Sequence, residues 1–368
     1  MKLSRLKKII EDINSISSRI ALEQIKILEV CGTHTHAIAR LGIKKIIDNK
    51  ISLISGPGCP VCVTEEGYID AAIKLSQEEK TILTFGDLMR VKGETTSLLE
   101  EKAKGRDIRI IYSVYDAITL AAGCKDKDFV LLAVGFETTS PLIAALVNEV
   151  IRLKISNLYF LTSLKLMPPI LEKLLKTDGD NIHGVICPGN VAVVSGARNF
   201  RFLYEDYKIP AVICGFEEED IILGIHFLVS TIEDKVIGKE GKRGFKNLYA
   251  RAVKEDGNVK AKALIEKYFD LYPSIWRGIG LVKDSGLKLK EKYAYLDAVK
   301  KFHLESFIDN GYETYKKERG CKCSDVLMGK ISPKECKLFG SLCTPRVPYG
   351  PCMVSTEGAC SAYYKYEL

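Results

Sequence analysis

Short apolar runs recur along the first two thirds of the chain, and each ends in a loop of glycine or polar residues. The first four begin at residues 25, 52, 81 and 108, so their starts lie 27, 29 and 27 residues apart. Amphipathic stretches such as NEVIRLKI (148–155) fill the gaps. Strand-length apolar runs that alternate with helical patterns indicate repeated βαβ units. The expected strands are 25–30, 52–55, 81–85, 108–112, 129–134, 158–162, 184–187 and 211–214.

Continuous apolar strands are typical of parallel sheets that helices cover on both faces. Four runs, a shorter gap and four further runs therefore predict an α/β fold with two similar parallel-sheet domains. After about residue 237 the rhythm stops, and a lysine-rich region with the motif WRGIG (276–280) precedes a cysteine-rich tail. The expected units are α/β domains at 21–126 and 127–237 and a mainly helical and irregular domain formed by 1–20 with 238–368.

Charge and hydropathy exclude several classes of partner. Lys and Arg number 54 and Asp and Glu 47, which gives a net charge of +7, but the two signs are interspersed. Without a basic tract or a nucleic-acid-binding motif, we expect no nucleic-acid partner. No apolar stretch approaches the roughly 20 residues that a membrane span needs. The first 20 residues read as a surface helix without a signal peptide's apolar core, so we expect a cytoplasmic protein.

Twelve cysteines are the main anomaly of the composition. Because a reducing cytoplasm disfavours structural disulfides, such a set indicates metal binding or thiol redox chemistry. Half of them are spread over the first two thirds of the chain, and the rest crowd its end. The second group consists of Cys321, Cys323, Cys336, Cys343, Cys352 and Cys360.

The segment CGTHTHAIAR (31–40) places Cys31, His34 and His36 directly after the first expected strand. A helix that starts here would favour the Cys31 thiolate through the N–H groups of its first turn. Thiolate and imidazole together suit iron(II) or zinc. The alternative is a buried thiol with histidines that cap the helix. Two of only five histidines lie within five residues of this cysteine, which favours a metal or catalytic site.

The segment GPGCPVCV (56–63) brings Cys59 and Cys62 to the end of the second expected strand. Two intervening residues allow the sulfurs to reach disulfide distance, and Pro60 fixes the turn. A zinc clip would need a second cysteine or histidine pair of matching spacing. Apart from the CGTHTH segment, the first expected domain offers none. The motif therefore favours a redox pair beside Cys31 at the mouth of the sheet.

The tail has the spacing C-x-C-x12-C-x6-C-x8-C-x7-C. One iron–sulfur or zinc site needs four thiolates, so two cysteines remain for a disulfide. Structural zinc is the alternative, but the paired C-x-x-C knuckles typical of zinc sites are missing from the tail. Irregular spacing suits a cluster wrapped by loops. The pattern favours a [4Fe-4S] cluster and leaves open which four cysteines bind it.

A set of motifs spread over nearly the whole chain resembles the family of the hydrogenase maturation factor HypD. Each motif alone is weak, and their combination is specific. They are CGTHTHAIARLGI, GPGCPVCV, FGDLMRV, VGFETT, ICPGNV, ICGFEEEDI and CTPRVPYGPCMVSTEGACSAYY.

The resemblance implies a role in building the Fe(CN)2CO unit of [NiFe]-hydrogenases. The chain would be a scaffold that acts with the small chaperone HypC and the cyanide donor HypE. Iron(II) carrying CN and CO would be transient cargo, held between a cysteine of the chaperone and Cys31, with Cys59 and Cys62 nearby. The family fold is two similar α/β domains and a [4Fe-4S] domain whose cluster surroundings resemble ferredoxin:thioredoxin reductase.

By position, the resemblance also assigns roles in the tail. The implied cluster ligands are Cys321, Cys336, Cys343 and Cys360, and the implied redox pair is Cys323 with Cys352. Electrons would pass from the cluster through this pair to Cys59 and Cys62, because thiol exchange requires contact between sulfurs. The imidazoles of His34 and His36 would tune the Cys31 thiolate or move protons.

Two positions depart from the family pattern. Asn190 stands where a PGHV-like motif has histidine, and Leu164 stands where a histidine precedes Lys165. Proton transfer or metal ligation by histidine is therefore not expected at either position.

Two other functions remain compatible with the residues. A stand-alone [4Fe-4S] disulfide reductase would use the cluster and the dithiols without low-spin iron. A nucleotide-binding protein with a structural zinc tail is the third candidate, but neither GxxxxGK[ST] nor GxGxxG occurs in the chain.

Overall fold

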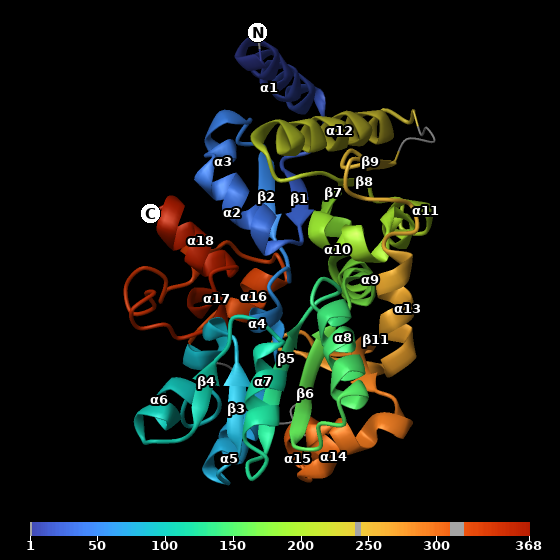
Figure 1. The fold of residues 1–368 in the computed structure, drawn as a ribbon. Coiled ribbons are helices and arrows are strands. Elements are labelled where there is room, and N and C mark those ends of the chain that lie inside the picture. Colours follow the sequence, from blue (N-terminus) through green and yellow to red (C-terminus); the bar gives the residue numbers. More distant parts are fainter. Residues whose placement is uncertain (1, 240–243, 310–319) are drawn as a thin grey trace.

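The computed structural model describes residues 2–239, 244–309 and 320–368 (Figure 1). Within these ranges the strands form two sheets. Sheet A has the order β2 (Ile51–Ser55), β1 (Ile25–Glu29), β7 (Gly184–Cys187), β8 (Ala211–Ile213) and β9 (Phe245–Asn247). Sheet B has the order β10 (Phe269–Trp276), β11 (Gly280–Leu289), β6 (Leu158–Lys165), β5 (Phe129–Gly135), β3 (Thr81–Thr84) and β4 (Ile108–Ile110).

Helices connect the strands and cover the sheets. Those of the first half are α1 (Lys2–Arg19), α2 (Gly32–Arg40), α3 (Ile43–Ile46), α4 (Pro60–Val63), α5 (Glu66–Gln77), α6 (Leu98–Ala103), α7 (Asp116–Gly123), α8 (Ser140–Arg152) and α9 (Met167–Asp178). Those of the second half are α10 (Gly189–Ser195), α11 (Phe202–Glu205), α12 (Glu218–Val236), α13 (Val259–Tyr268), α14 (Ala298–Lys301), α15 (Glu305–Asp309), α16 (Cys323–Leu327), α17 (Pro351–Val354) and α18 (Ala359–Tyr366). No helix of the described ranges is both long and apolar enough to cross a bilayer.

Every expected apolar run forms a strand, with small shifts at the ends. The strand β5 shows why such runs are continuous. Its residues Phe129, Leu131 and Ala133 belong to the core on one face of sheet B. The alternate residues Val130, Leu132 and Val134 belong to the core on the other face. Successive side chains of a strand point to opposite faces, so a sheet covered on both faces needs apolar residues at every position. The predicted α/β class with two mainly parallel sheets is confirmed.

The distribution of strands between the sheets differs from the expected division at 126/127. The strands β3 and β4 lie with β5 and β6 in sheet B, and β7 and β8 lie with β1 in sheet A. The chain therefore crosses between the sheets after β2, after β6 and after β9. Periodicity locates strands but does not specify which strands pair, so sequential grouping was the wrong basis for the division.

The expected helical unit of 1–20 and 238–368 also differs from the structure. The strand β9 extends sheet A, and β10 and β11 form an antiparallel hairpin that pairs with β6. Much of this hairpin is exposed on one face, which interrupts its apolar pattern. The helix α1 packs on α12, where Arg19 pairs with Glu233 at 2.7 Å. The tail helices α16, α17 and α18 lie beside α2 and α4 (Figure 1).

Candidate functional site

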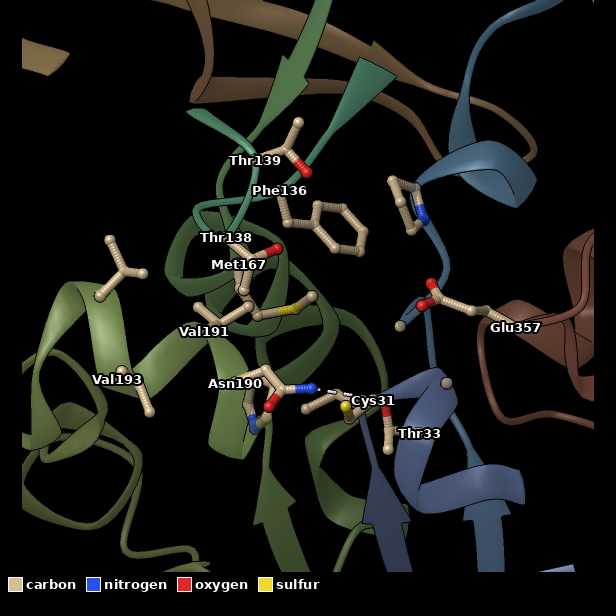
Figure 2. Close-up of a pocket in the computed structure, with 16 residues that line it drawn as sticks. Cys31, Thr33, Phe136, Thr138, Thr139, Met167, Asn190, Val191, Val193 and Glu357 are labelled. Carbon is tan, nitrogen blue, oxygen red and sulfur yellow. Dashed lines mark hydrogen bonds between the residues drawn. The ribbon is translucent and has the colours of Figure 1, made fainter. Parts of the chain in front are cut away.

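A cavity of about 430 Å³ lies where the carboxyl ends of strands from both sheets meet (Figure 2). In sheet A, β1 pairs with β2 on one side and β7 on the other, which makes a topological switch point between β1 and β7. The segments after these strands line the cavity, together with segments after β5 and β6 from sheet B. The main lining residues are Cys31, Thr33, Gly58, Pro60, Phe136, Thr138, Thr139, Met167, Asn190 and Glu357.

Cys31 is the thiol of this cavity. It follows β1, is the N-cap residue of α2 and is only 8% exposed. Its N–H donates to Oε2 of Glu29 at 3.3 Å. Burial raises the pKa of Cys31 to about 11, although the backbone N–H groups of His34 and Thr33 oppose the shift. The start of the helix thus lowers the pKa of Cys31, as expected, but the effect of burial is larger. A metal that binds Cys31 must therefore displace a proton.

The two histidines of the CGTHTH segment contact other groups. Nε2 of His34 lies 3.0 Å from the carbonyl oxygen of Gly215 and 3.6 Å from Sγ of Cys214. Burial lowers the pKa of His34 to about 4, so this imidazole is neutral. The half-buried ring of His36 packs edge-on against Tyr366 of α18. Neither histidine is among the residues that line the cavity, and tuning of the Cys31 thiol by either imidazole stays a prediction.

The turn that carries the CPVC motif lies directly against Cys31. The N–H of Gly32 donates to the carbonyl oxygen of Gly58 at 3.2 Å. A Cβ atom at Gly58 would lie 2.6 Å from the backbone nitrogen of Cys31, so only glycine allows this approach. The parallel pairing of β1 with β2 brings the two motifs together, because both follow the carboxyl ends of neighbouring strands.

Cys59 and Cys62 form a disulfide and are buried. Cys59 is the N-cap residue of α4, and its Sγ accepts a hydrogen bond from the N–H of Cys62 at 3.1 Å. Gly58 and Pro60 line the cavity, whereas Sγ of Cys62 lies 3.8 Å from the carbonyl oxygen of Pro351 in the tail. The pair therefore forms part of the wall between the Cys31 cavity and the tail, and its sulfurs do not line the cavity.

The tail cysteines form overlapping contacts. The Sγ atoms of Cys323 and Cys352 are 2.7 Å apart. The contact with Cys323, a second contact with Cys360 and burial together raise the pKa of Cys352 well above its usual value. Burial raises the pKa of the Cys343 thiol, and the nearby thiols of Cys360 and Cys336 act in the same direction. Cys321 is partly exposed, and the other tail cysteines are buried.

The donor chemistry of this region suits an iron–sulfur cluster, because buried thiols are the usual cluster ligands. Cys336 and Cys360 lie near enough to Cys343 to help raise the pKa of its thiol. In the described ranges, no three histidine, cysteine, aspartate or glutamate side chains are arranged as ligands of one metal ion. The tail thus supplies the right donors in one region without a ligand set already in coordination geometry.

Acidic side chains near the cavity were not predicted from the sequence. Burial raises the pKa values of Glu29 and Glu137 to about 7 in each case. Glu357 lines the cavity from the tail, and burial raises its pKa as well. Glu29 and Glu137 could have been recognised as carboxylates inside or directly after an apolar run, in KILEV and VGFET. Glu357 lies within a tail motif that was interpreted only for its cysteines.

The two departures from the family pattern occupy different environments. Nδ2 of Asn190 lies 3.4 Å from Oγ1 of Thr33 and faces the cavity near Cys31 (Figure 2). Leu164 is fully buried in a core of sheet B. Thr139 is the N-cap residue of α8, but its side chain makes no capping hydrogen bond.

Comparison with known proteins agrees with the motifs. The family model HypD, described as "Hydrogenase formation hypA family", matches residues 4–367. A putative hydrogenase expression/formation protein of Methanocaldococcus jannaschii is 40% identical, over 98% of this chain and 97% of its own. The hydrogenase maturation factor HypD of Rhizobium leguminosarum is 40% identical, over 92% of this chain and 87% of its own.

A third relative, the hydrogenase maturation factor HypD of Cupriavidus necator, is 37% identical, over 94% of this chain and 90% of its own. The family match over residues 4–367 includes the cavity, the CPVC turn and the cysteine-rich tail, and the relatives extend over nearly the full length. The chain belongs to the HypD family of hydrogenase formation and maturation proteins.

Proposed function

We propose that this protein is the scaffold on which the Fe(CN)2CO unit of [NiFe]-hydrogenases is assembled. It would act with a HypC-type chaperone and a HypE-type cyanide donor. The observation that carries the proposal is the backbone contact between the Cys31 turn and the Gly58–Pro60 turn at a cavity of about 430 Å³. This contact places a free thiol and a disulfide on adjoining turns, and the cavity would accommodate a small iron complex.

In this proposal Cys31 supplies one ligand to the iron, and the chaperone supplies another thiolate. Low-spin iron(II) prefers such soft donors. Because burial raises the pKa of Cys31, the thiol gives up its proton only when the metal arrives. The polar side chains of Thr138, Thr139 and Asn190 also line the cavity and would surround the cargo.

The Cys59–Cys62 disulfide would accept electrons from the tail. A thiolate of the Cys323–Cys352 pair would attack one sulfur of the disulfide, and the second tail thiolate would then release the Cys59–Cys62 dithiol. The tail pair becomes a disulfide, so two electrons pass from one pair to the other. Cys59, Cys62, Cys323 and Cys352 belong to one buried apolar cluster, so the exchange would take place away from solvent.

We propose Cys321, Cys336, Cys343 and Cys360 as ligands of a [4Fe-4S] cluster, which would supply electrons to the tail pair. The short Cys323–Cys352 contact supports the pair, and the proximity of Cys343 to Cys336 and Cys360 supports three of the four ligands. A low-potential electron carrier would restore the reduced state.

The test is infrared spectroscopy of the full chain, purified without oxygen together with a HypC-type chaperone. We expect CN and CO stretching bands and iron beyond that of the cluster. Cys31→Ala should remove the bands and leave the cluster absorption unchanged, whereas Cys124→Ala, at the end of α7, should keep both. Loss of the cluster in Cys31→Ala would contradict the division of roles.

Metal and sulfide analysis of the same preparation separates the other functions. A chain with cluster iron and labile sulfide, but without CN and CO bands in the presence of the chaperone and cyanide donor, would be a stand-alone disulfide reductase. About one zinc per chain, without iron or sulfide, would overturn the proposal and indicate a structural zinc tail.

A further inference from the structure

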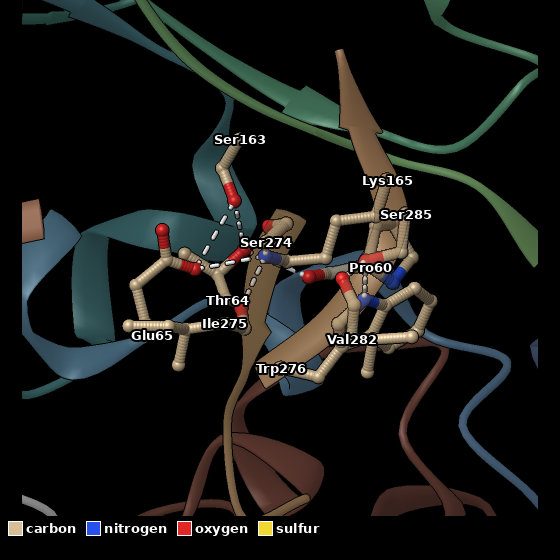
Figure 3. Close-up of polar contacts among 10 residues, drawn as sticks. All are labelled: Pro60, Thr64, Glu65, Ser163, Lys165, Ser274, Ile275, Trp276, Val282 and Ser285. Carbon is tan, nitrogen blue, oxygen red and sulfur yellow. Dashed lines mark hydrogen bonds and ion pairs between the residues drawn. The ribbon is translucent and has the colours of Figure 1, made fainter. Parts of the chain in front are cut away.

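A buried ion pair lies next to the residues that follow the CPVC motif (Figure 3). Nζ of Lys165, at the end of β6, lies 2.9 Å from Oε2 of Glu65. The two side chains are 0% and 4% exposed. Nζ also donates to Oγ of Ser274 at 2.9 Å and to the carbonyl oxygen of Ile275 at 2.6 Å. An ammonium has three N–H donors, and each has an acceptor here.

Such a pair needs an explanation other than stability. Removing two charges from water costs several kcal/mol per ion, and an apolar pair of similar volume is often as stable. A buried ion pair with complete hydrogen bonding fixes orientation, because its members cannot shift without leaving a charge unpaired. The elements that this pair joins are therefore the elements whose relative placement it controls.

One side of the network holds the CPVC turn. Glu65 is three residues beyond Cys62, and Ser163 of β6 donates to its carboxylate at 3.4 Å. The hydroxyl of Thr64 donates to the carbonyl oxygen of Pro60 at 2.9 Å and lies 3.4 Å from the Ser163 hydroxyl. Thr64 and Glu65, the residues that follow the CPVC helix, are thus tied to strand β6.

The other side of the network holds the end of the β10–β11 hairpin, which contains the WRGIG motif. Lys165 binds Ser274 and Ile275, and two residues later the N–H of Arg277 donates to the carbonyl oxygen of Val63 at 2.9 Å. Trp276 is fully buried, and its ring lies 5.8 Å from Nζ of Lys165. The hairpin end and the CPVC helix are therefore fixed to each other through both backbone and side chain.

The hairpin end also touches the tail. Gly278 has a φ of +77°, and a Cβ atom there would lie 2.6 Å from Oγ of Ser324, the residue after Cys323. In the CPVC helix itself, Sγ of Cys62 lies 3.8 Å from the carbonyl oxygen of Pro351, the residue before Cys352. The hairpin and the CPVC helix thus contact the tail next to each cysteine of its pair.

We propose that the Lys165–Glu65 ion pair positions the residues of a thiol–disulfide exchange. It would hold the Cys59–Cys62 turn and the WRGIG hairpin end in a fixed arrangement next to the Cys323–Cys352 pair. This inference rests on the proposed relay. Exchange requires a thiolate to approach a disulfide sulfur in line, so a small displacement of one pair slows the reaction greatly. Lys165 and Glu65 are positioning residues, since neither touches the reacting sulfurs in the contacts observed.

The experiment measures reduction of the Cys59–Cys62 disulfide in the anaerobic full chain. Two molecules of reduced methyl viologen supply the two electrons, and samples are quenched with acid and an alkylating reagent. Mass spectrometry then follows the Cys59–Cys62 peptide and the two tail peptides. The rate in a Cys352→Ser chain gives the part of the reduction that bypasses the tail pair.

Four variants separate positioning from stability. Lys165→Met leaves the Glu65 carboxylate buried and unpaired, so it should lower the melting temperature and slow the reduction. The double variant Lys165→Met with Glu65→Gln carries no buried charge and should regain most of the melting temperature. Lys165→Arg keeps the charge and should restore part of the rate. Tyr68→Phe is the matched control, because it removes a buried 2.8 Å hydrogen bond from α5 to Leu161 of β6 outside the network.

We expect the tail-dependent rate to fall about tenfold or more in the double variant despite its restored melting temperature, and to stay unchanged in Tyr68→Phe. A double variant with the wild-type rate would overturn the positioning role. If the wild-type chain itself is reduced no faster than Cys352→Ser, the proposed relay fails, and this result is distinct from failure of the positioning role.

Discussion

The Sγ atoms of Cys323 and Cys352 lie 2.7 Å apart in a buried contact between α16 and α17. The thiol of Cys352 also contacts Cys360, which in turn lies near Cys343. The tail therefore contains a close thiol pair beside a second group of cysteines. This arrangement gives the two groups different expected responses to substitution.

Loss of one member of the pair should spare the cluster. We expect Cys323→Ser to retain about four iron and four sulfide per chain after anaerobic reconstitution, because a [4Fe-4S] cluster needs four thiolates and the proposed ligands remain. Cys336→Ser should lose most of the cluster, since it removes a proposed ligand. Visible absorption together with iron and sulfide analysis measures both. Equal losses in the two variants would contradict the division of the six cysteines.

The sequence predicted the strands of this fold well, and the reason is local. The central strands of a parallel sheet that is covered on both faces must be apolar at every position. For this reason β5 could be located from FVLLAV alone. The assignment of β3 to sheet B and β7 to sheet A depends on pairing between distant segments. The periodicity of a segment does not indicate which other strand it pairs with.

The same distinction applies to the site. The proximity of Cys31 and the CPVC turn was predictable, because both follow apolar strands whose carboxyl ends share one edge. The contact between Lys165 and Glu65 was not, since 100 residues separate them and neither belongs to a motif with known spacing. The hairpin residues that complete this network lie in a segment that was expected to be helical or irregular.

The close approach of Gly58 to Cys31 should make this glycine irreplaceable. A Cβ atom there would lie 2.6 Å from the nitrogen and 2.7 Å from the Cα of Cys31, so the backbone of one of the two turns would have to shift. We expect Gly58→Ala to lower the free energy of unfolding by about 1–3 kcal/mol, the range found for overpacking. Denaturant unfolding measures the change.

Gly123→Ala is the matched control, because a Cβ atom at Gly123 meets nothing within 4 Å. It should leave stability unchanged or raise it by a few tenths of a kcal/mol. Similar destabilisation by both substitutions would show that the Cys31 and CPVC turns are not in the backbone contact described.

Asp87 should control the order of the tail loop that carries Glu357. Its Oδ2 accepts hydrogen bonds from Oγ of Ser355 at 3.0 Å and from Oγ1 and the backbone N–H of Thr356 at 3.1 and 3.3 Å. Hydrogen bonds to a charged group contribute about 1.5–3 kcal/mol, so Asp87→Ala should speed amide hydrogen exchange at Thr356 by roughly tenfold or more. Mass spectrometry of the tail peptide measures the exchange.

Asp116→Ala provides the comparison for the loop experiment. Asp116 also accepts backbone hydrogen bonds, from Tyr112 and Ser113 at the start of α7, but it has no contact with the tail loop in the bonds described. It should speed exchange near α7 and leave Thr356 unchanged. An unchanged Thr356 in Asp87→Ala as well would mean that the loop is held by other contacts.

The buried carboxyl group of Glu137 should make stability depend on pH. Oε1 accepts the N–H of Met167 at 2.8 Å, while Oε2 is buried without a partner. Burial raises its pKa from 4.5 to about 7. Between these values the folded protein keeps a proton that the unfolded chain has lost, so the free energy of unfolding falls as pH rises through this interval.

The expected size of this effect follows from the interval, which corresponds to about 3 kcal/mol at roughly 1.4 kcal/mol per pH unit. Glu137→Gln cannot ionise, so its advantage over wild type should be near zero at pH 4.5, grow with rising pH and level off above pH 7. Denaturant unfolding of both proteins from pH 4.5 to 8 measures the difference, in which the contributions of other groups cancel. Parallel stability curves for the two proteins would show that this carboxyl ionises alike in the folded and unfolded chain, because only a shifted pKa makes the two curves diverge with pH.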